Sequence, residues 1–170
     1  MNDRAGDPGR RKMKLMLFTD GSVNTKLRVG YGAYLAFPED QQSLTSHIKL
    51  KLFEDTSSSK LELQTLLWAL SEISAPEVIS YTDSQTIVGL TLRRKKLEEN
   101  DYYARNGRRL KNHELYKQLY KFTDNLNITF TQIKGHTPGN SKSHIDIIFS
   151  LVDRASRKAL RVYTSTIIGN

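Results

Sequence analysis

The sequence contains no cysteine, and this absence excludes two classes of site at once. Without thiols the chain can form neither a disulfide framework nor a thiolate metal centre. Any bound metal would therefore be held by oxygen or imidazole ligands, and this limitation points to hard divalent ions.

Long apolar runs are also missing from the 170 residues. A membrane-spanning helix needs about 20 consecutive apolar residues, and the basic start of the chain leads into a short alternating segment rather than the apolar core of a signal peptide. We therefore expect a cytoplasmic, monomeric protein that does not enter a membrane. The composition predicts a flexible basic tail at residues 1–13 and a single domain at 14–170.

Positive charge is in excess, and it is concentrated in one part of the chain. The net charge is +8 and the isoelectric point is near 9.7, which favours polyanionic partners. Residues 93–121 contain ten Lys or Arg, four Asp or Glu and four tyrosines. This segment is interpreted either as a helical protrusion that grips a nucleic-acid backbone or as a solvated helical hairpin docked on the sheet.

Hydrophobic periodicity predicts alternating strands and helices. Apolar alternation predicts strands at 14–20, 31–37 and 46–53 in meander order. Leucines at helical spacing predict a helix that begins near Ser59 and ends before Pro76. A strand at 78–82 then returns parallel to the first, followed by a helix at 86–96, a strand at 128–133 and a C-terminal helix.

Two of these strands end in similar polar sequences. Phe-Thr-Asp-Gly-Ser occupies 18–22 and Tyr-Thr-Asp-Ser-Gln occupies 81–85, so that Asp20 and Asp83 follow apolar runs in the same way. Asp20 with Gly21 also fits a simple turn, and Glu62 three residues after Ser59 fits a capping box. His136, taken alone, is an ordinary polar loop residue.

Four sequence blocks in this order resemble the type 1 ribonuclease H family over residues 14–162. The blocks are 18–22, Lys-Leu-Glu-Leu at 60–63, 81–85, and Lys-Gly-His at 134–136 followed by Asp-Arg-Ala-Ser-Arg at 153–157. The resemblance implies an α/β fold of the ribonuclease H type. Its mixed five-stranded sheet, with three antiparallel and then two parallel strands, is flanked by helices.

The resemblance also implies a metal-dependent endonuclease that cuts the RNA strand of RNA–DNA hybrids and leaves 5′-phosphate and 3′-hydroxyl ends. Two Mg²⁺ ions, or Mn²⁺ in their place, would be bound by four carboxylates, and a loop histidine would assist proton transfer or product departure. In this sequence the corresponding residues are Asp20, Glu62, Asp83, Asp153 and His136. Carboxylate oxygens suit Mg²⁺, and a metal pair can serve both ends of an in-line displacement.

Several assignments within this resemblance have alternatives. Many relatives place the last aspartate about ten residues after the histidine; that spacing selects Asp146, whereas the surrounding sequence favours Asp153. Substrate contacts are expected at Asn24, Ser58, Ser59 and Gln85, which also fit turn or capping roles.

The basic segment differs from the family's basic protrusion because it lacks tryptophan. The single Trp of the chain is Trp68, so Tyr102 and Tyr103 are the candidate replacements. Two other functions stay open. One is a catalytically silent module that binds hybrid or double-stranded RNA, and the other is a nuclease of the same fold with another substrate, such as a DNA junction.

Overall fold

The computed structural model describes residues 13–41, 47–134 and 143–169. The predicted basic tail lies almost entirely outside these residues, and so does His136. Among the described residues, none of the helices is long and apolar enough to cross a membrane. The elements follow one another as β1 (Lys14–Asn24), β2 (Val29–Pro38), β3 (Lys49–Glu54), α1 (Ser58–Glu72), β4 (Glu77–Thr82), α2 (Gln85–Glu99), α3 (His113–Asn125), β5 (Asn127–Gln132) and α4 (His144–Ile168).

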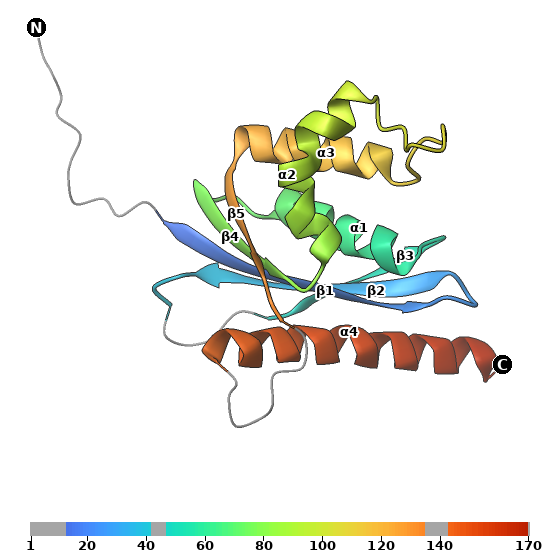
Figure 1. Ribbon diagram of the computed structural model, residues 1–170. Helices are drawn as coiled ribbons and strands as arrows, with labels where there is room; N and C mark the ends of the chain where they lie inside the picture. Colours follow the sequence, from blue (N-terminus) through green and yellow to red (C-terminus); the bar gives the residue numbers. More distant parts are fainter. Residues whose placement is uncertain (1–12, 42–46, 135–142, 170) are drawn as a thin grey trace, which may run out of the picture.

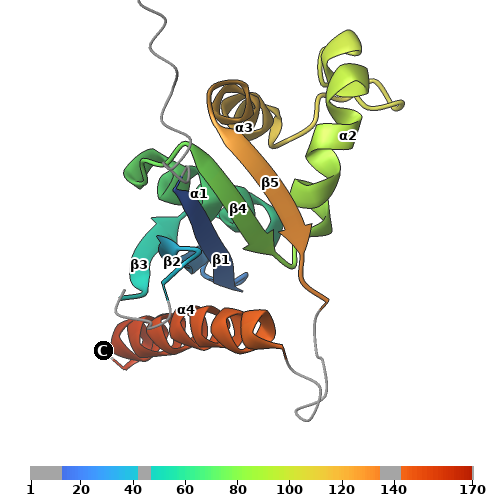
Figure 2. The ribbon, with the colours of Figure 1, turned by 90° about the vertical axis from the view of Figure 1, so that its left-hand side faces the viewer.

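The strands form one mixed sheet in the order β3-β2-β1-β4-β5. β1 pairs antiparallel with β2 and parallel with β4, while β2 with β3 is antiparallel and β4 with β5 is parallel. Helices α1, α2 and α3 cover one face of the sheet and α4 covers the other (Figures 1 and 2). The predicted fold, with three antiparallel and then two parallel strands, is confirmed.

The central strand β1 is buried on both faces, which explains its unbroken apolar run. Leu17 belongs to the core under α1, α2 and α3, together with Leu66 and Val78. The next residue, Phe18, points to the opposite face and packs in a second core with Val152 of α4. Because successive strand residues alternate between faces, Asp20 and Ser22 lie on the α4 side of the sheet.

β1 continues four residues beyond its predicted end. It reaches Asn24, and the antiparallel pairing with β2 includes Gly21 opposite Gly32 and Val23 opposite Gly30. The interpretation of Asp20 and Gly21 as a turn is therefore wrong, and so is the placement of Asp20 at the tip of a strand. The parallel pairing of β1 with β4 does end close by, at Phe18.

Glycines let helix α1 approach the β1–β2 hairpin closely. A Cβ atom added at Gly21 or Gly30 would lie 2.8 or 2.6 Å from the Cδ2 atom of Leu61. At Gly30 the added atom would also lie 2.8 Å from the carbonyl oxygen of Ser22, which cannot move as a side chain can. Bare backbone at these positions therefore sets the depth at which α1 sits on the sheet.

We expect Gly30→Ala to lower the free energy of unfolding by about 1–3 kcal/mol, because overpacking at this contact forces α1 or the strand to shift. Gly89→Ala is the matched control, since a Cβ there has its nearest neighbour at 3.6 Å, the Nε atom of Arg93. Replacing a helical glycine by alanine should raise stability by about 0.5–1 kcal/mol. Urea denaturation measures both changes, and equal effects of the two substitutions would contradict the packing argument.

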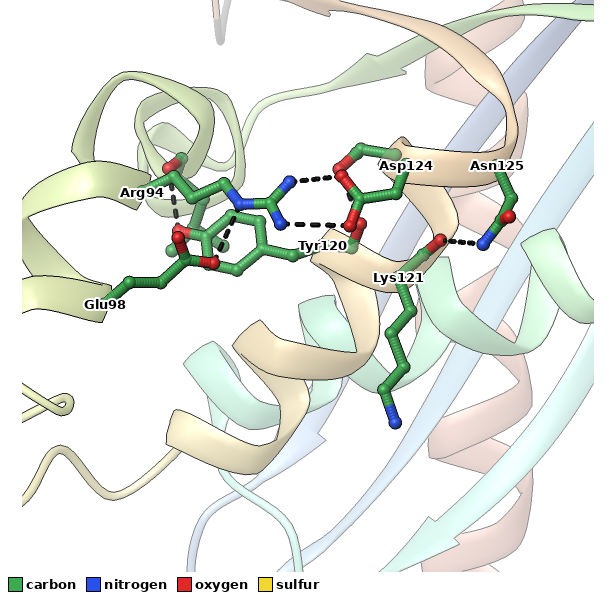
Figure 3. Close-up of polar contacts among 8 residues, drawn as sticks. Arg94, Glu98, Tyr120, Lys121, Asp124 and Asn125 are labelled. Carbon is green, nitrogen blue, oxygen red and sulfur yellow. Dashed lines mark hydrogen bonds and ion pairs between the residues drawn. The ribbon is translucent and has the colours of Figure 1, made fainter.

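The basic segment forms part of α2, an irregular loop at 100–112 and α3, rather than a simple helical hairpin. Arg94 of α2 fixes the two helices together, as Figure 3 shows. Its guanidinium pairs with both carboxylate oxygens of Asp124 and with Glu98, and it lies 4.8 Å from the ring centroid of Tyr120. The buried Tyr120 hydroxyl donates to the carbonyl of Leu90 at 2.8 Å. These contacts fix the orientation of α2 relative to α3.

Candidate active site

The ends of β1 and β4 bring two aspartates to the same edge of the sheet. Phe18 and Tyr81 are register partners, and their rings stack with centroids 4.7 Å apart on the α4 face. Asp20 and Asp83 each follow two residues later and therefore point to that same face. Because neighbouring strands lie about 4.8 Å apart, the two carboxyl groups come close together beyond the last paired residues.

Helix α4 supplies a third carboxylate to this face. The hydroxyls of Ser22 on β1 and Ser156 on α4 are 3.0 Å apart, which fixes α4 against the strand. Asp153 lies one turn before Ser156, and its carboxyl group is close enough to Asp20 to raise the pKa of that residue. The Nε atom of Arg157 donates to Asp153 at 2.7 Å.

Glu62 reaches the site from α1, on the opposite face of the sheet. Leu61, packed on the hairpin glycines, places the first turns of α1 beside β1. The hydroxyl of Ser84 donates to Glu62 at 2.5 Å and accepts from the backbone N–H of Ile87 at 3.3 Å. Ser84 thus caps α2 and holds the Glu62 carboxylate next to Asp83.

Burial and mutual repulsion raise the pKa of three carboxyl groups here. The pKa of Asp20 is raised to about 8, first by burial, then by the negative charge of Asp83 and by the contact with Asp153. Burial raises the pKa of Asp83, to which the charge of Asp153 adds while Arg157 opposes it. The pKa of Glu62 is raised by burial, and the Ser84 hydrogen bond works against that shift. These shifts are typical of crowded carboxylates that lack a cation.

The chemistry of these donors suits hard divalent cations, because carboxylate oxygens from four different elements face one region. Within the described ranges, no three His, Asp or Glu side chains are already placed so that they could enclose a metal ion.

The capping interpretation of Glu62 is wrong. Helix α1 begins at Ser58, so Ser57 rather than Ser59 occupies the N-cap position, and no side-chain capping bond forms there. With Ser57 at the cap, the capping-box position is residue 60, and Glu62 lies two positions farther along the helix. Its carboxylate bonds to Ser84 instead.

The predicted substrate-contact residues lie in different places. Gln85 is exposed at the first position of α2, two residues after Asp83, and Ser58 and Ser59 are exposed at the start of α1. The side chain of Asn24 accepts from the backbone N–H groups of Lys26 and Leu27, both at 3.1 Å, and so shapes the hairpin turn. At about 3.3 Å per strand residue, Asn24 lies about 13 Å along β1 from Asp20.

The two candidates for the last aspartate have different surroundings. Asp146 lies in the first turn of α4, where its carboxylate accepts from the backbone N–H and the hydroxyl of Ser143, both at 2.9 Å. Asp153 lies two turns later, beside Asp20. The geometry of the described residues therefore places Asp153 in the acidic cluster and gives Asp146 a capping role.

Sequence reasoning missed two side chains that support the cluster, Ser84 and Arg157. Both had a local signal. Ser84 directly precedes the first residue of α2, which is a position that favours a capping serine. Arg157 follows Asp153 by four residues, a spacing at which opposite charges meet on a helix. Neither signal revealed that Ser84 also bonds to Glu62 or that Arg157 also influences the pKa of Asp83.

The fold and site define an α/β protein whose acidic cluster lies where two parallel strands end. The family model for RNase H matches residues 12–152, and the chain therefore belongs to the RNase H family. The match stops one residue before Asp153, so the assignment of that aspartate depends on the structure.

Named relatives agree with this membership. Ribonuclease H of Acetivibrio thermocellus is 26% identical over 137 residues, covering 78% of this chain and 90% of that protein. Ribonuclease HI of Haemophilus influenzae is 28% identical over 126 residues, covering 72% and 79%.

Solved structures agree with the fold. The RNase H domain of PFV has a TM-score of 0.72 at 18% identity, covering 89% of this chain and 97% of that domain. LC9-RNase H1, described as a type 1 RNase H with the type 2 active-site motif, has a TM-score of 0.67 at 14% identity, covering 88% and 72%.

Proposed function

We propose that this protein is a metal-dependent endonuclease that hydrolyses the RNA strand of RNA–DNA hybrids, leaving 5′-phosphate and 3′-hydroxyl ends. The observation that carries this proposal is the crowding of four carboxylates, Asp20, Glu62, Asp83 and Asp153, at one edge of the sheet, where burial and neighbouring charges raise the pKa of the first three. Membership of the RNase H family gives the cluster its chemical context.

In this proposal Asp20 and Asp83 are the shared metal ligands, and Glu62 and Asp153 complete the set. Bound Mg²⁺ ions would supply an activated water and stabilise charge on the leaving oxygen. The protein's own task is to hold four carboxylates against their repulsion. Ser84 orients Glu62, Arg157 orients Asp153, and the hydroxyl pair of Ser22 and Ser156 fixes α4 against β1.

The remaining parts of the proposal concern substrate and leaving groups. Gln85 and Ser58 are exposed beside the cluster, where polar side chains would meet the 2′-hydroxyls that distinguish RNA from DNA. The cations of residues 93–121 would bind the phosphates of the hybrid. His136, which lies outside the described residues, would assist proton transfer or product departure.

A substrate panel tests this proposal. The protein is incubated with uniformly labelled RNA–DNA hybrid, RNA duplex, DNA duplex, a DNA junction and each single strand, in Mg²⁺, in Mn²⁺ and in chelator. We expect cleavage of the RNA strand of the hybrid alone, only with a divalent ion, and products that carry 5′-phosphate ends.

The other outcomes separate the competing functions. Tight binding of hybrid or RNA duplex without cleavage under any ion would identify a silent binding module. Cleavage of the junction in preference to the hybrid would identify a nuclease of the same fold with another substrate. Hybrid cleavage that continues in chelator would rule out the role assigned to the carboxylates.

A further inference from the structure

A hollow of about 520 Å³ lies between α2 and the loop at 100–112, away from the acidic cluster. Its volume falls within the range of about 300–1,000 Å³ typical of small-molecule pockets. At about 1.5 Å per helical residue, its residues Arg93 and Lys96 lie about 12 and 17 Å along α2 from Gln85. A molecule in the hollow would therefore not touch the carboxylates.

One face of α2 forms the first wall of this hollow. Arg93, Lys96, Leu97 and Asn100 line it, and their spacing of three, four and seven residues places them on a single helical face. Arg94 points elsewhere, into the pairing with Asp124 that fixes α2 on α3 (Figure 3). Because Arg94 is turned about 100° away from Arg93 around the helix, its pairing with Asp124 leaves the face that lines the hollow directed towards the loop.

The second wall is a loop whose backbone is held in a defined conformation. Tyr102 is buried, at 5% exposure, and its carbonyl accepts from the backbone N–H of Leu110 at 2.8 Å. The adjacent Tyr103 points outward, with 48% exposure, and is bridged to Arg109. The guanidinium of Arg109 lies 5.6 Å from the Tyr103 ring centroid and bonds to Asp101. An aromatic surface is therefore ordered before any ligand arrives.

The cations of the hollow are not occupied by acidic partners. Most charged residues nearby are paired, as in Lys95 with Glu99 and Lys117 with Glu114. Within the described part of the chain, neither Lys96 nor Arg105 has an ion pair. Among the same described residues, the hydrogen bonds of the Arg93 guanidinium go to two backbone carbonyls, those of Gly89 and Thr86.

We propose that this hollow binds a single unpaired nucleotide, with its base against Tyr103 and its phosphate near Lys96 and Arg105. Cations alone would suit a phosphate, but the volume, the exposed ring of Tyr103 and the apolar walls at Leu97 and Leu110 leave room for a base. A base offers its face to an aromatic side chain only when it is outside a duplex stack. The side-chain nitrogen of Asn100 donates to the carbonyl of Lys96 at 2.7 Å, so its oxygen is the group that would accept a hydrogen bond from the edge of the base.

The nucleotide site would deepen the proposed function, because it predicts a preference for hybrids that adjoin a single-stranded segment. The measurements on hybrids rest on the proposed function. Its test uses fluorescence anisotropy in chelator, with a blunt hybrid, the same hybrid extended by a six-nucleotide DNA overhang, single-stranded DNA and a nucleoside monophosphate. We expect the overhang to tighten binding about tenfold, as expected for stacking of one base. Tyr103→Phe should keep this gain and Tyr103→Ala should lose it.

Matched variants separate stacking from charge. Arg105→Gln should weaken the binding of single-stranded DNA and reduce its salt dependence by about 0.7 in the logarithmic slope, the effect of one lost phosphate contact on a single strand. Lys158→Gln removes an exposed charge from α4 and should leave the overhang gain unchanged. Thermal unfolding of each variant verifies that the fold is retained.

Two results would overturn the inference while leaving the proposed function intact. One is equal binding of blunt and overhung hybrids by the unmodified protein, and the other is an undiminished overhang gain in folded Tyr103→Ala. A protein that fails to cleave hybrid, yet binds single-stranded DNA through Tyr103, would fail the proposed function and support the hollow as a nucleotide site. The monophosphate distinguishes a free nucleotide, which would bind alone, from a nucleotide within a strand.

Discussion

Asp20→Asn should reduce hybrid cleavage by about 10³-fold or more, because Asp20 is the proposed shared metal ligand and an amide lacks the negative charge that binds the cations. The bound cations would contribute several kcal/mol of transition-state stabilisation. Initial rates on labelled hybrid in saturating Mg²⁺ measure the change. Asp40→Asn is the matched control, since Asp40 is an exposed aspartate in the turn after β2, near the start of β1 and away from Asp20, and its amide should leave the rate unaltered. Hybrid cleavage that survives Asp20→Asn would refute the site.

The same substitution should stabilise the metal-free protein, which separates a lost ligand from a damaged fold. The pKa of Asp20 in the folded protein is about 8, against an ordinary value of 3.8. Between these pH values the folded state binds a proton that the unfolded state releases, so its stability falls as pH rises. Urea denaturation in chelator should show this fall in the unmodified protein and a flatter profile in Asp20→Asn. Added Mg²⁺ should restore stability at pH 8 only when Asp20 is present. If the stability of the unmodified protein and of Asp20→Asn changed with pH in the same way, the repulsion among the carboxylates would be contradicted.

The central layer of the fold could be predicted because its signals are local. The apolar run before Asp20 and the matching run before Asp83 are each complete within a few residues, and the helix α1, which follows the β1–β3 meander, returns the chain so that β4 lies parallel to β1. With Phe18 opposite Tyr81 in the register, strand alternation turns both aspartates to the same side. The strands themselves have local signals, whereas this register comes from the packed sheet.

The extent of β1 and the start of α1 could not be predicted in the same way. Gly21 carries an ordinary turn signal, and it remains in the strand because Leu61 packs on it from a helix 40 residues away in the sequence. Three consecutive serines, 57–59, stand around the start of α1, and any of them is an acceptable cap by type. The position of the helix is decided instead by the burial of Leu61 and Leu63.

The partner of Glu62 was also hidden from sequence patterns. A capping box explains a glutamate near a helix start without reference to the rest of the chain, whereas the observed bond joins Glu62 to Ser84, 22 residues later. Rules based on sequence spacing favour a partner nearby in the sequence, even where a distant residue such as Ser84 is the one that forms the bond. Only the packing of α1 beside β1 and the start of α2 reveals that the carboxylate is used across elements.

The two aspartates of α4 differ in what their loss should cost, and this difference decides the last ligand. Asp153 adjoins Asp20 and is held by Arg157, so Asp153→Asn should lower the rate of hybrid cleavage by about 10²-fold or more at fixed Mg²⁺. Asp146 lies seven residues earlier, which is about 10 Å along the helix, and its carboxylate completes a capping box with Ser143.

Asp146→Asn should therefore lower the free energy of unfolding by about 0.5–1 kcal/mol and change the cleavage rate by less than about threefold, because an amide caps less well than a carboxylate near the positive end of a helix. Paired measurements of rate, Mg²⁺ dependence and urea denaturation on both variants separate the roles. Mg²⁺ binding to the inactive variants, followed by calorimetry, should be weakened by Asp153→Asn alone. A loss of cleavage with Asp146→Asn but not with Asp153→Asn would transfer the ligand role to the start of α4, and α4 would then have to shift by two turns relative to Asp20.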